Sequence, residues 1–323
     1  MLCPWISFFD TQCDNMRFLW KGIVTLESLI TISNAVFSAE IAPYGAELRS
    51  LKRISDGKEY IWQRDPKYWG DSAPMLFPIC GRLNNHCYTY EGATYEMAFH
   101  GFLQSSTPAE VRKESAAVEL IFRDDETTYA QYPFHFVLTV RFALTEIGLR
   151  CQITVENTDE KTMYYSVGAH PGFSLPLKDG CVLEDHYLRF PEAGEVQQAI
   201  IDNDGLFTGE LPPYTLAANN EIRLSEEQFA IDGIFLRGVG GVTELHCDGA
   251  DDFICVVCPM SDLVGTWKEY GADAKFLCLE PWCGYPSVTG VADVLQEKLG
   301  MYALAPSDKG AFAYDVEICP ETK

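Results

Sequence analysis

Two short stretches of this sequence carry groups that can move protons. In residues 166–176, His170 follows two small residues and precedes a Pro-Gly turn, so the chain bends directly after the histidine and presents its ring at the end of an element. In residues 278–287, Glu280 follows an apolar run and precedes a proline, which predicts a carboxylate held at the end of a strand. One acid and one base at two strand ends are the minimum set for proton transfer to and from a substrate.

Two further polar residues stand beside glycines in the loop-like region between residues 66 and 101. Arg82 follows a glycine and His100 precedes one, so each can approach a ligand closely. Taken singly, Arg82 is equally consistent with a surface ion pair, and His100 or His170 with a histidine that satisfies hydrogen bonds at a buried corner. Their occurrence together with Glu280 favours a ligand site.

The segments that must position these groups alternate apolar and polar residues with the period of two that is typical of β-strands. Two such segments, 136–144 and 149–155, are joined by a hairpin turn at 145–148. Helical patterns are short and few. The further expected strands are 30–32, 35–41, 60–62, 118–122, 253–257 and 312–318, and the expected helical turns are 127–131, 225–229 and 291–299. Many strands with few short helices predict an all-β fold, a large antiparallel β-sandwich or barrel.

The domain organisation follows from length and composition. The chain has 323 residues, 47% of them apolar, and no Pro-, Gly- and Ser-rich linker divides it. We therefore expect a single domain over residues 23–323. Residues 1–22 lack a periodic pattern and are interpreted as a poorly defined N-terminal extension.

Charge and cysteine usage exclude several classes of protein. The net charge of −23 repels phosphate backbones and anionic lipids, so we expect no nucleic-acid and no membrane partner. No window approaches 18 apolar residues, and the start of the chain lacks the features of an export signal. The twelve cysteines stand singly in apolar runs, which favours reduced thiols in a cytoplasmic protein. Cys255 and Cys258 lie three apart in a strand-like run and so face opposite sides, which argues against a shared metal.

Five motifs occur in an order that resembles the aldose 1-epimerases, the galactose mutarotase-like family, and in particular their compact bacterial subgroup. They are G-R-L-N-N-H at 81–86, H-G-F at 100–102, V-G-A-H-P-G-F-S-L-P at 167–176, D-x-x-F at 232–235 and C-L-E-P-W-C-G at 278–284. The resemblance extends from about residue 24 to residue 318. The pair H-P-x-F and E-P-W-x-G carries most of its specificity. It implies a large antiparallel β-sandwich, in agreement with the strand pattern.

The resemblance also implies an isomerase that interconverts the α and β anomers of a free hexose such as glucose or galactose. Glu280 would act as general base on the C1 hydroxyl and His170 as general acid at the ring oxygen. Arg82, His100 and Asp232 would hold sugar hydroxyls. No metal or other cofactor is needed for this reaction. Trp69 or Trp282 could offer an apolar face to the sugar, although a role in the core is the more common one for tryptophan.

Two alternatives remain open at this point. A hexose-6-phosphate mutarotase of the same fold would need several basic side chains near the site, and the matched motifs contain Arg82 alone. A carbohydrate-binding or sensing protein would keep the cleft without the chemistry, but binding alone does not require both His170 and Glu280. The sequence leaves the oligomeric state undetermined.

Overall fold

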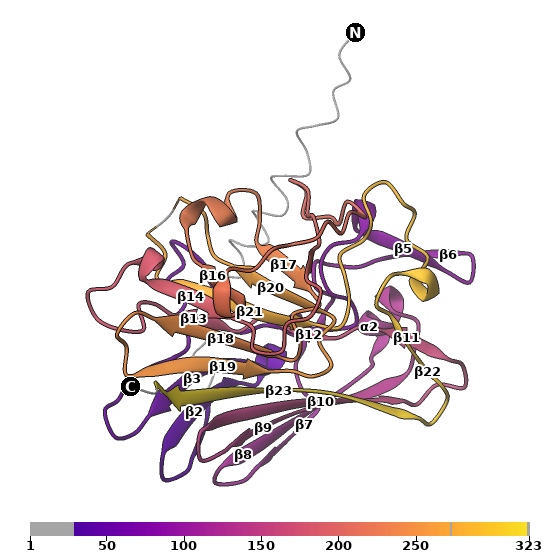
Figure 1. The fold of residues 1–323 in the computed structure, drawn as a ribbon. Helices are drawn as coiled ribbons and strands as arrows, with labels where there is room; N and C mark the ends of the chain where they lie inside the picture. Colours follow the sequence, from indigo (N-terminus) through magenta and orange to yellow (C-terminus); the bar gives the residue numbers. More distant parts are fainter. Residues whose placement is uncertain (1–28, 272, 322–323) are drawn as a thin grey trace.

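Two large antiparallel sheets dominate the fold (Figure 1). The computed structural model describes residues 29–271 and 273–321, and the expected extension at 1–22 lies outside them. None of the helices in this part of the chain has the length and hydropathy that a bilayer crossing requires. Every pairing between named strands is antiparallel, which confirms the all-β prediction.

The larger sheet has nine strands. Their order is β16 (Glu221–Arg223), β14 (His186–Arg189), β18 (Val242–Cys247), β19 (Asp252–Val257), β23 (Lys309–Pro320), β10 (Gly148–Asn157), β9 (Phe136–Leu144), β8 (Ala117–Arg123) and β7 (Glu110–Lys113). The predicted hairpin is β9 and β10. Alternate residues of both strands are buried, because a half-covered sheet buries one side chain in two.

The second sheet has seven strands and carries the candidate site. Its order is β15 (Gln197–Gln198), β17 (Ile234–Arg237), β20 (Leu263–Trp267), β21 (Phe276–Trp282), β12 (Gly168–Ala169) and β4 (Met75–Leu76), and β13 (Gly172–Ser174) also pairs with β21. All seven residues of β21 are buried, as expected for a strand covered on both faces.

Three smaller sheets complete the strand set. They are β1 (Ile30–Ser33), β2 (Phe37–Ala42) and β3 (Glu47–Arg53); β5 (Cys87–Tyr90) with β6 (Ala93–Glu96); and β11 (Met163–Tyr165) with β22 (Tyr302–Leu304). The apolar side chains of these sheets and of the two large ones form a continuous core that includes residues from Ile32 to Ile318.

The helical segments are short. The turn expected at 127–131 is α2 (Glu126–Gln131), whose first turn is capped because the Asp125 carboxylate accepts the Thr128 amide at 2.8 Å. The turn expected at 225–229 is a 3₁₀ turn at Glu226–Phe229. The remaining 3₁₀ turns are Tyr44–Ala46, Asn84–His86, Leu103–Ser105, Leu183–Asp185, Ala218–Asn220 and Leu295–Glu297.

Two expected elements are wrong. The helix at 291–299 is reduced to the 3₁₀ turn Leu295–Glu297. The Asp293 carboxylate instead accepts the Asn84 amide at 2.9 Å and the nearby Ser287 hydroxyl at 2.5 Å, so side-chain bonds, one of them to a distant segment, replace the helical pattern. The strand at 60–62 is also wrong: Ile61 forms an isolated bridge with Phe173 and no ladder.

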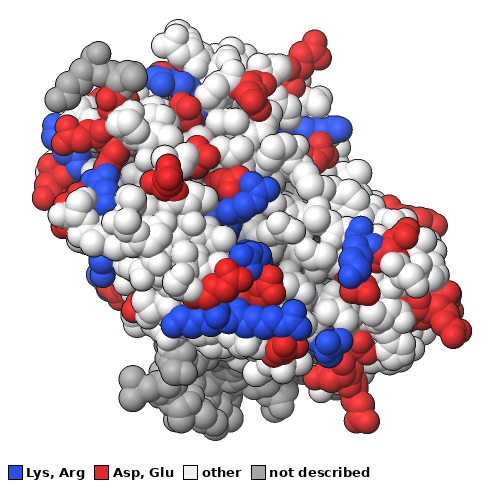
Figure 2. Space-filling view, turned by 90° about the horizontal axis from the view of Figure 1, so that it is seen from below, with Lys and Arg blue, Asp and Glu red and all other residues white. Residues whose placement is uncertain are grey.

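Basic and acidic side chains are interspersed on the face shown in Figure 2. The lysines and arginines (blue) lie beside acidic side chains (red) and form no continuous basic surface. Cross-strand pairs contribute to this pattern, for example Arg150 with Asp315 at 3.1 Å and Lys309 with Glu156 at 2.8 Å. Such exposed pairs add little stability.

Candidate active site

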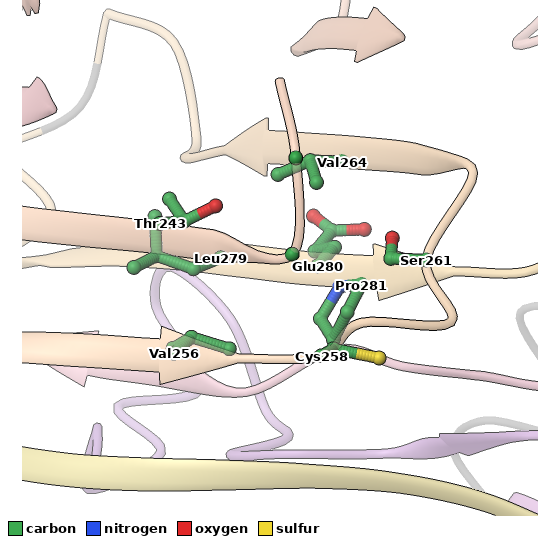
Figure 3. A pocket seen from close by; sticks show the side chains of 10 residues that line it. Thr243, Val256, Cys258, Ser261, Val264, Leu279, Glu280 and Pro281 are labelled. Atoms are coloured by element: carbon green, nitrogen blue, oxygen red, sulfur yellow. The ribbon is translucent and has the colours of Figure 1, made fainter. Parts of the chain in front are cut away.

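Strand β21 positions Glu280 in the seven-stranded sheet. Side chains alternate along the strand, so Cys278, Glu280 and Trp282 share one face while Leu279 and Pro281 share the other. Figure 3 shows the Glu280 carboxylate and the Pro281 ring leaving the strand on opposite sides. The expectation that Glu280 ends its strand is wrong, because β21 continues through Trp282.

A proline inside a paired strand needs an explanation, because it cannot donate to the ladder. The amides two residues before and two residues after Pro281 donate to the carbonyls of Pro171 and Val167, at 3.1 and 3.0 Å. Alternate amides point to the same neighbour, so the nitrogen of Pro281 faces the segment between those two carbonyls. There the neighbouring strand is interrupted between β12 and β13. The interruption carries His170 to the side of Glu280.

His170 and Glu280 form a close buried pair. Their Nε2 and Oε1 atoms lie 3.2 Å apart, and their side chains are 12% and 1% exposed. The contact lacks hydrogen-bond geometry, and Glu280 Oε1 and His170 Nδ1 have no hydrogen-bond partner. The indole rings of Trp69 and Trp267 flank the imidazole at centroid distances of 5.2 and 5.8 Å.

Burial shifts the proton affinity of both members of this pair. It raises the pKa of Glu280 well above its usual 4.5, with a further contribution from the charge of Asp232. Burial also lowers the pKa of His170 to about 4. Each shift favours an uncharged side chain in the low-dielectric interior. Both shifts favour a protonated carboxyl beside a neutral imidazole over a carboxylate beside an imidazolium.

His100 enters the same space from the opposite side. Its Nδ1 accepts the Gly81 amide at 3.1 Å, so the ring proton of the neutral imidazole is on Nε2. That Nε2 is buried and unpartnered. Burial, together with the charges of His170 and Arg82, lowers the pKa of His100 well below 6.5, and the residue is a neutral hydrogen-bond donor.

Arg82 and Asp232 lie at the rim. The Arg82 guanidinium lies over the Phe99 ring at 4.4 Å from its centroid. Burial raises the pKa of Asp232 above 3.8, an effect that Arg82 partly offsets. Between them Gly205 approaches closely, because a Cβ atom at this position would lie 3.0 Å from Arg82 Nε and 3.8 Å from an Asp232 carboxylate oxygen.

All five predicted site residues line one cavity of about 330 Å³. Its further lining includes Trp69 and Trp282, which the sequence allows as apolar faces for a sugar but favours as core residues. The other lining residues were not predicted: Trp267, Phe235, Ile231, Phe99, Ile201, Asn203, Asp204, Gly205, Gly81 and Pro286. Trp282 contributes a buried, unpartnered indole nitrogen. The Asp-Asn-Asp-Gly sequence at 202–205 is a turn signal, and its density of polar groups could have identified the loop.

The cavity is suited to a polar ligand of modest size. Four of its side-chain atoms are buried without hydrogen-bond partners: His100 Nε2, His170 Nδ1, Glu280 Oε1 and Trp282 Nε1. Unpartnered buried polar groups are costly, and a ligand with several hydroxyl groups would satisfy them. His170, Cys278 and Glu280 also bring three possible metal-ligand atoms to within 4.8 Å of one another.

The comparisons with known proteins agree with this geometry. A family model described as aldose 1-epimerase matches residues 28–236, which include four of the five predicted site residues; Glu280 lies beyond the match. This chain belongs to the aldose 1-epimerase family. A curated relative is the plasmid-encoded protein LacX of Lactococcus lactis subsp. lactis, 30% identical over 310 residues, which cover 90% of this chain and 99% of LacX.

Solved structures also resemble this aldose 1-epimerase family member. A galactose mutarotase related enzyme from Lactobacillus acidophilus is 30% identical with a TM-score of 0.84, covering 91% of this chain and 98% of that one. A galactose mutarotase-like protein from Lactobacillus casei is 29% identical with a TM-score of 0.85, covering 90% of this chain and 100% of that one. These similarities confirm the predicted fold and family.

Proposed function

We propose that this aldose 1-epimerase family member interconverts the α and β anomers of a free hexose, such as glucose or galactose. The observation that carries the proposal is the 3.2 Å separation of His170 Nε2 and Glu280 Oε1 inside a buried cavity. Acid and base groups contribute to catalysis when they lie within hydrogen-bond reach of the atoms that exchange protons.

In the proposed reaction, Glu280 removes the proton of the C1 hydroxyl while His170 protonates the ring oxygen. The bond between C1 and the ring oxygen breaks as the C1–O1 bond becomes a carbonyl. Rotation about C1–C2 presents the other face of the aldehyde, and reversal of both proton transfers closes the ring. No electrons leave the substrate, so the reaction needs no redox partner.

A pair that shares one titratable proton suits this reaction cycle. One proton on the pair gives either two neutral groups or a carboxylate beside an imidazolium, and the net charge is the same in both cases. Burial favours the neutral distribution in the empty cavity. Sugar hydroxyls that donate to Glu280 would stabilise its carboxylate, which is the form that the proposed base requires.

The other cavity residues would hold the sugar in place. His100 Nε2 and Trp282 Nε1 supply hydrogen-bond donors, and Arg82 and Asp232 lie at the rim beside the loop that contains Gly205. Trp69 and Phe235 present apolar surface for the C–H face of the ring. Fixed orientation of C1 between two proton-transfer groups lowers the entropy cost of the reaction.

The charge of the cavity disfavours the hexose-6-phosphate alternative. Among its described lining residues Arg82 is the one Lys or Arg, whereas Asp204, Asp232 and Glu280 are acidic. A phosphate dianion needs convergent cationic or amide donors. The sensing alternative is disfavoured because binding alone does not require an acid and a base 3.2 Å apart, as His170 and Glu280 are.

We also propose that residues 23–323 form one catalytic domain in the cytoplasm. The cavity uses residues from Trp69 to Pro286, so most of the chain contributes to one site. The ten cysteines that the structure describes are free thiols, which supports a reducing compartment.

Anomer exchange measured by NMR tests the proposal. Equilibrated glucose, galactose and glucose 6-phosphate are compared with catalytic amounts of wild type, Glu280→Gln and His170→Asn. We expect exchange of a free hexose that falls at least about 100-fold in both variants. Exchange confined to the phosphate would favour the alternative substrate, and sugar binding without exchange would overturn the enzymatic proposal.

A further inference from the structure

The acid–base pair is part of a cluster of three potential metal ligands. A ring nitrogen of His170, the sulfur of Cys278 and a carboxylate oxygen of Glu280 all lie within 4.8 Å of one another. Cys278 and Glu280 are 0% and 1% exposed. The reaction proposed above uses two members of the cluster and leaves Cys278 unexplained.

The strand register brings the third ligand into place. Cys278 and Glu280 are two residues apart on β21 and therefore share a face. The register partner of Cys278 on β13 is Gly172, and a Cβ atom built there would lie 3.4 Å from the sulfur. The same Cβ atom would lie 2.6 Å from the Trp69 ring, so the indole packs into the space that the missing side chain leaves beside the thiol.

The distances match those around a small tetrahedral ion. Two ligands about 2.1 Å from a tetrahedral ion lie about 3.4 Å apart. His170 Nε2 and Glu280 Oε1 are already 3.2 Å apart. The other separations in the cluster are no greater than 4.8 Å.

The electrical environment also favours a cation. Glu280, Asp232 and Asp204 all line the cavity, and Arg82 is the one basic residue among its described lining. A divalent ion would bind the deprotonated carboxylate and thiolate, with release of their protons, and would offset the acidic lining.

We propose that His170, Cys278 and Glu280 bind a thiophilic divalent cation of the Zn²⁺ class, with the fourth coordination position open to the cavity. Nitrogen, thiolate and carboxylate are all ligands of Zn²⁺, and the thiolate disfavours Mg²⁺ and Ca²⁺. An ion in this position occupies both proton-transfer groups, so it inhibits the reaction proposed above. The inhibition rests on that proposed function, but the binding site does not.

Co²⁺ provides a direct probe of the site. Thiolate ligation to Co²⁺ gives a charge-transfer absorption band, and calorimetry with Zn²⁺ gives the stoichiometry. We expect one ion per chain and a thiolate band in wild type, both lost in Cys278→Ala. Cys283→Ser is the matched control, since Cys283 is buried in the same region but lies outside the cluster; it should keep the band. His170→Asn should weaken Zn²⁺ binding at least about 10-fold and tests the site independently if Cys278→Ala does not fold.

A band that persists in Cys278→Ala, or an absence of Co²⁺ and Zn²⁺ binding by folded wild type, would overturn the proposal. Activity gives a separate readout. Zn²⁺ should inhibit anomer exchange in competition with the sugar, with relief by chelator, while Cys278→Ala keeps its activity and becomes resistant. Binding without inhibition would overturn the inhibitory role alone, and a chain that lacks mutarotase activity would still give the spectroscopic result.

Discussion

Gly265 of β20 is the register partner of Glu280 on β21. A Cβ atom at Gly265 would lie 2.8 Å from the Phe235 ring and 3.2 Å from Glu280 Cβ. The ring of Phe235 packs on Trp282 with 5.3 Å between centroids. A glycine therefore leaves room for the aromatic wall beside the proposed base.

We expect Gly265→Ala to displace Phe235 and Glu280. Overpacking should cost about 1–3 kcal/mol of unfolding free energy, and kcat/KM for anomer exchange should fall at least about 10-fold because the base moves relative to C1. Urea unfolding and NMR exchange measure the two effects. Gly194→Ala is the control, because a Cβ atom there would meet the Gly238 carbonyl oxygen at 3.8 Å; equal activity of both variants would contradict the prediction.

His100→Phe should weaken sugar binding more than catalysis. The substitution keeps a planar ring but removes the Nε2 donor and the acceptor of the Gly81 amide. We expect KM to rise by a factor that corresponds to about 1–3 kcal/mol, with a smaller change in kcat. Long-range ¹⁵N NMR of wild type should show the Nε2-protonated tautomer. An unchanged KM, or a protonated Nδ1, would exclude the proposed role.

A buried carboxylate joins the N-terminal sheet to the nine-stranded sheet. Asp252 is 4% exposed and accepts Lys58 Nζ and Arg53 at 2.6 Å each and the Tyr60 hydroxyl at 3.1 Å. Burial alone would raise the pKa of Asp252, but the two cations hold it below 3.8.

We expect Asp252→Asn to destabilise the protein by about 2–3 kcal/mol, because two partly buried cations lose their counter-charge. Asp56→Asn is the matched control: Asp56 also pairs with Arg53, but its side chain is 45% exposed, and its loss should cost no more than about 1 kcal/mol. Urea denaturation gives both values. Equal losses would show that burial does not set the strength of these pairs.

His170 should make stability depend on pH. Its pKa is about 4 in the folded protein and 6.5 in its usual state, so the unfolded chain takes up a proton first as the pH falls. Wild type then loses stability from about pH 6.5 down to about pH 4, by at most about 1.4 kcal/mol per pH unit. His170→Asn lacks this contribution.

The difference in unfolding free energy between His170→Asn and wild type should therefore shift in favour of the variant on going from about pH 7.5 to about pH 5. Urea unfolding at several pH values measures it. A difference that stays constant with pH would mean that the imidazole does not resist protonation in the folded protein.

Local sequence patterns predicted the strands that are buried on one face only. Strands β9 and β10 alternate over most of their length, and their hairpin was correctly predicted. The segment 291–299 shows the limit of this approach. Its apolar spacing suits a helix, but bonds from Asp293 to residues more than 200 positions away determine its conformation. A short stretch of sequence carries no information about contacts between residues so far apart in the chain.

The motifs predicted five residues that line one cavity, but they did not predict how the strands and loops place these residues there. Motif resemblance assembled five side chains that all line one cavity. The position of Glu280 within its strand depends on the break opposite Pro281, which is a property of the neighbouring strands. Trp282 was assigned to the core because a buried tryptophan usually belongs there, and its unpartnered nitrogen becomes evident in the assembled structure alone.

The proposed base and the rim of the cavity come from different kinds of element, and this difference has an evolutionary consequence. The proposed base and one cavity donor stand two residues apart on the central strand β21, whereas the rim comes from the loops around residues 203–205 and 231–232. Loops tolerate replacement far better than a strand paired on both edges. Under the proposed function, exchange of these loops would therefore change the sugar preference while Glu280 keeps its place in β21.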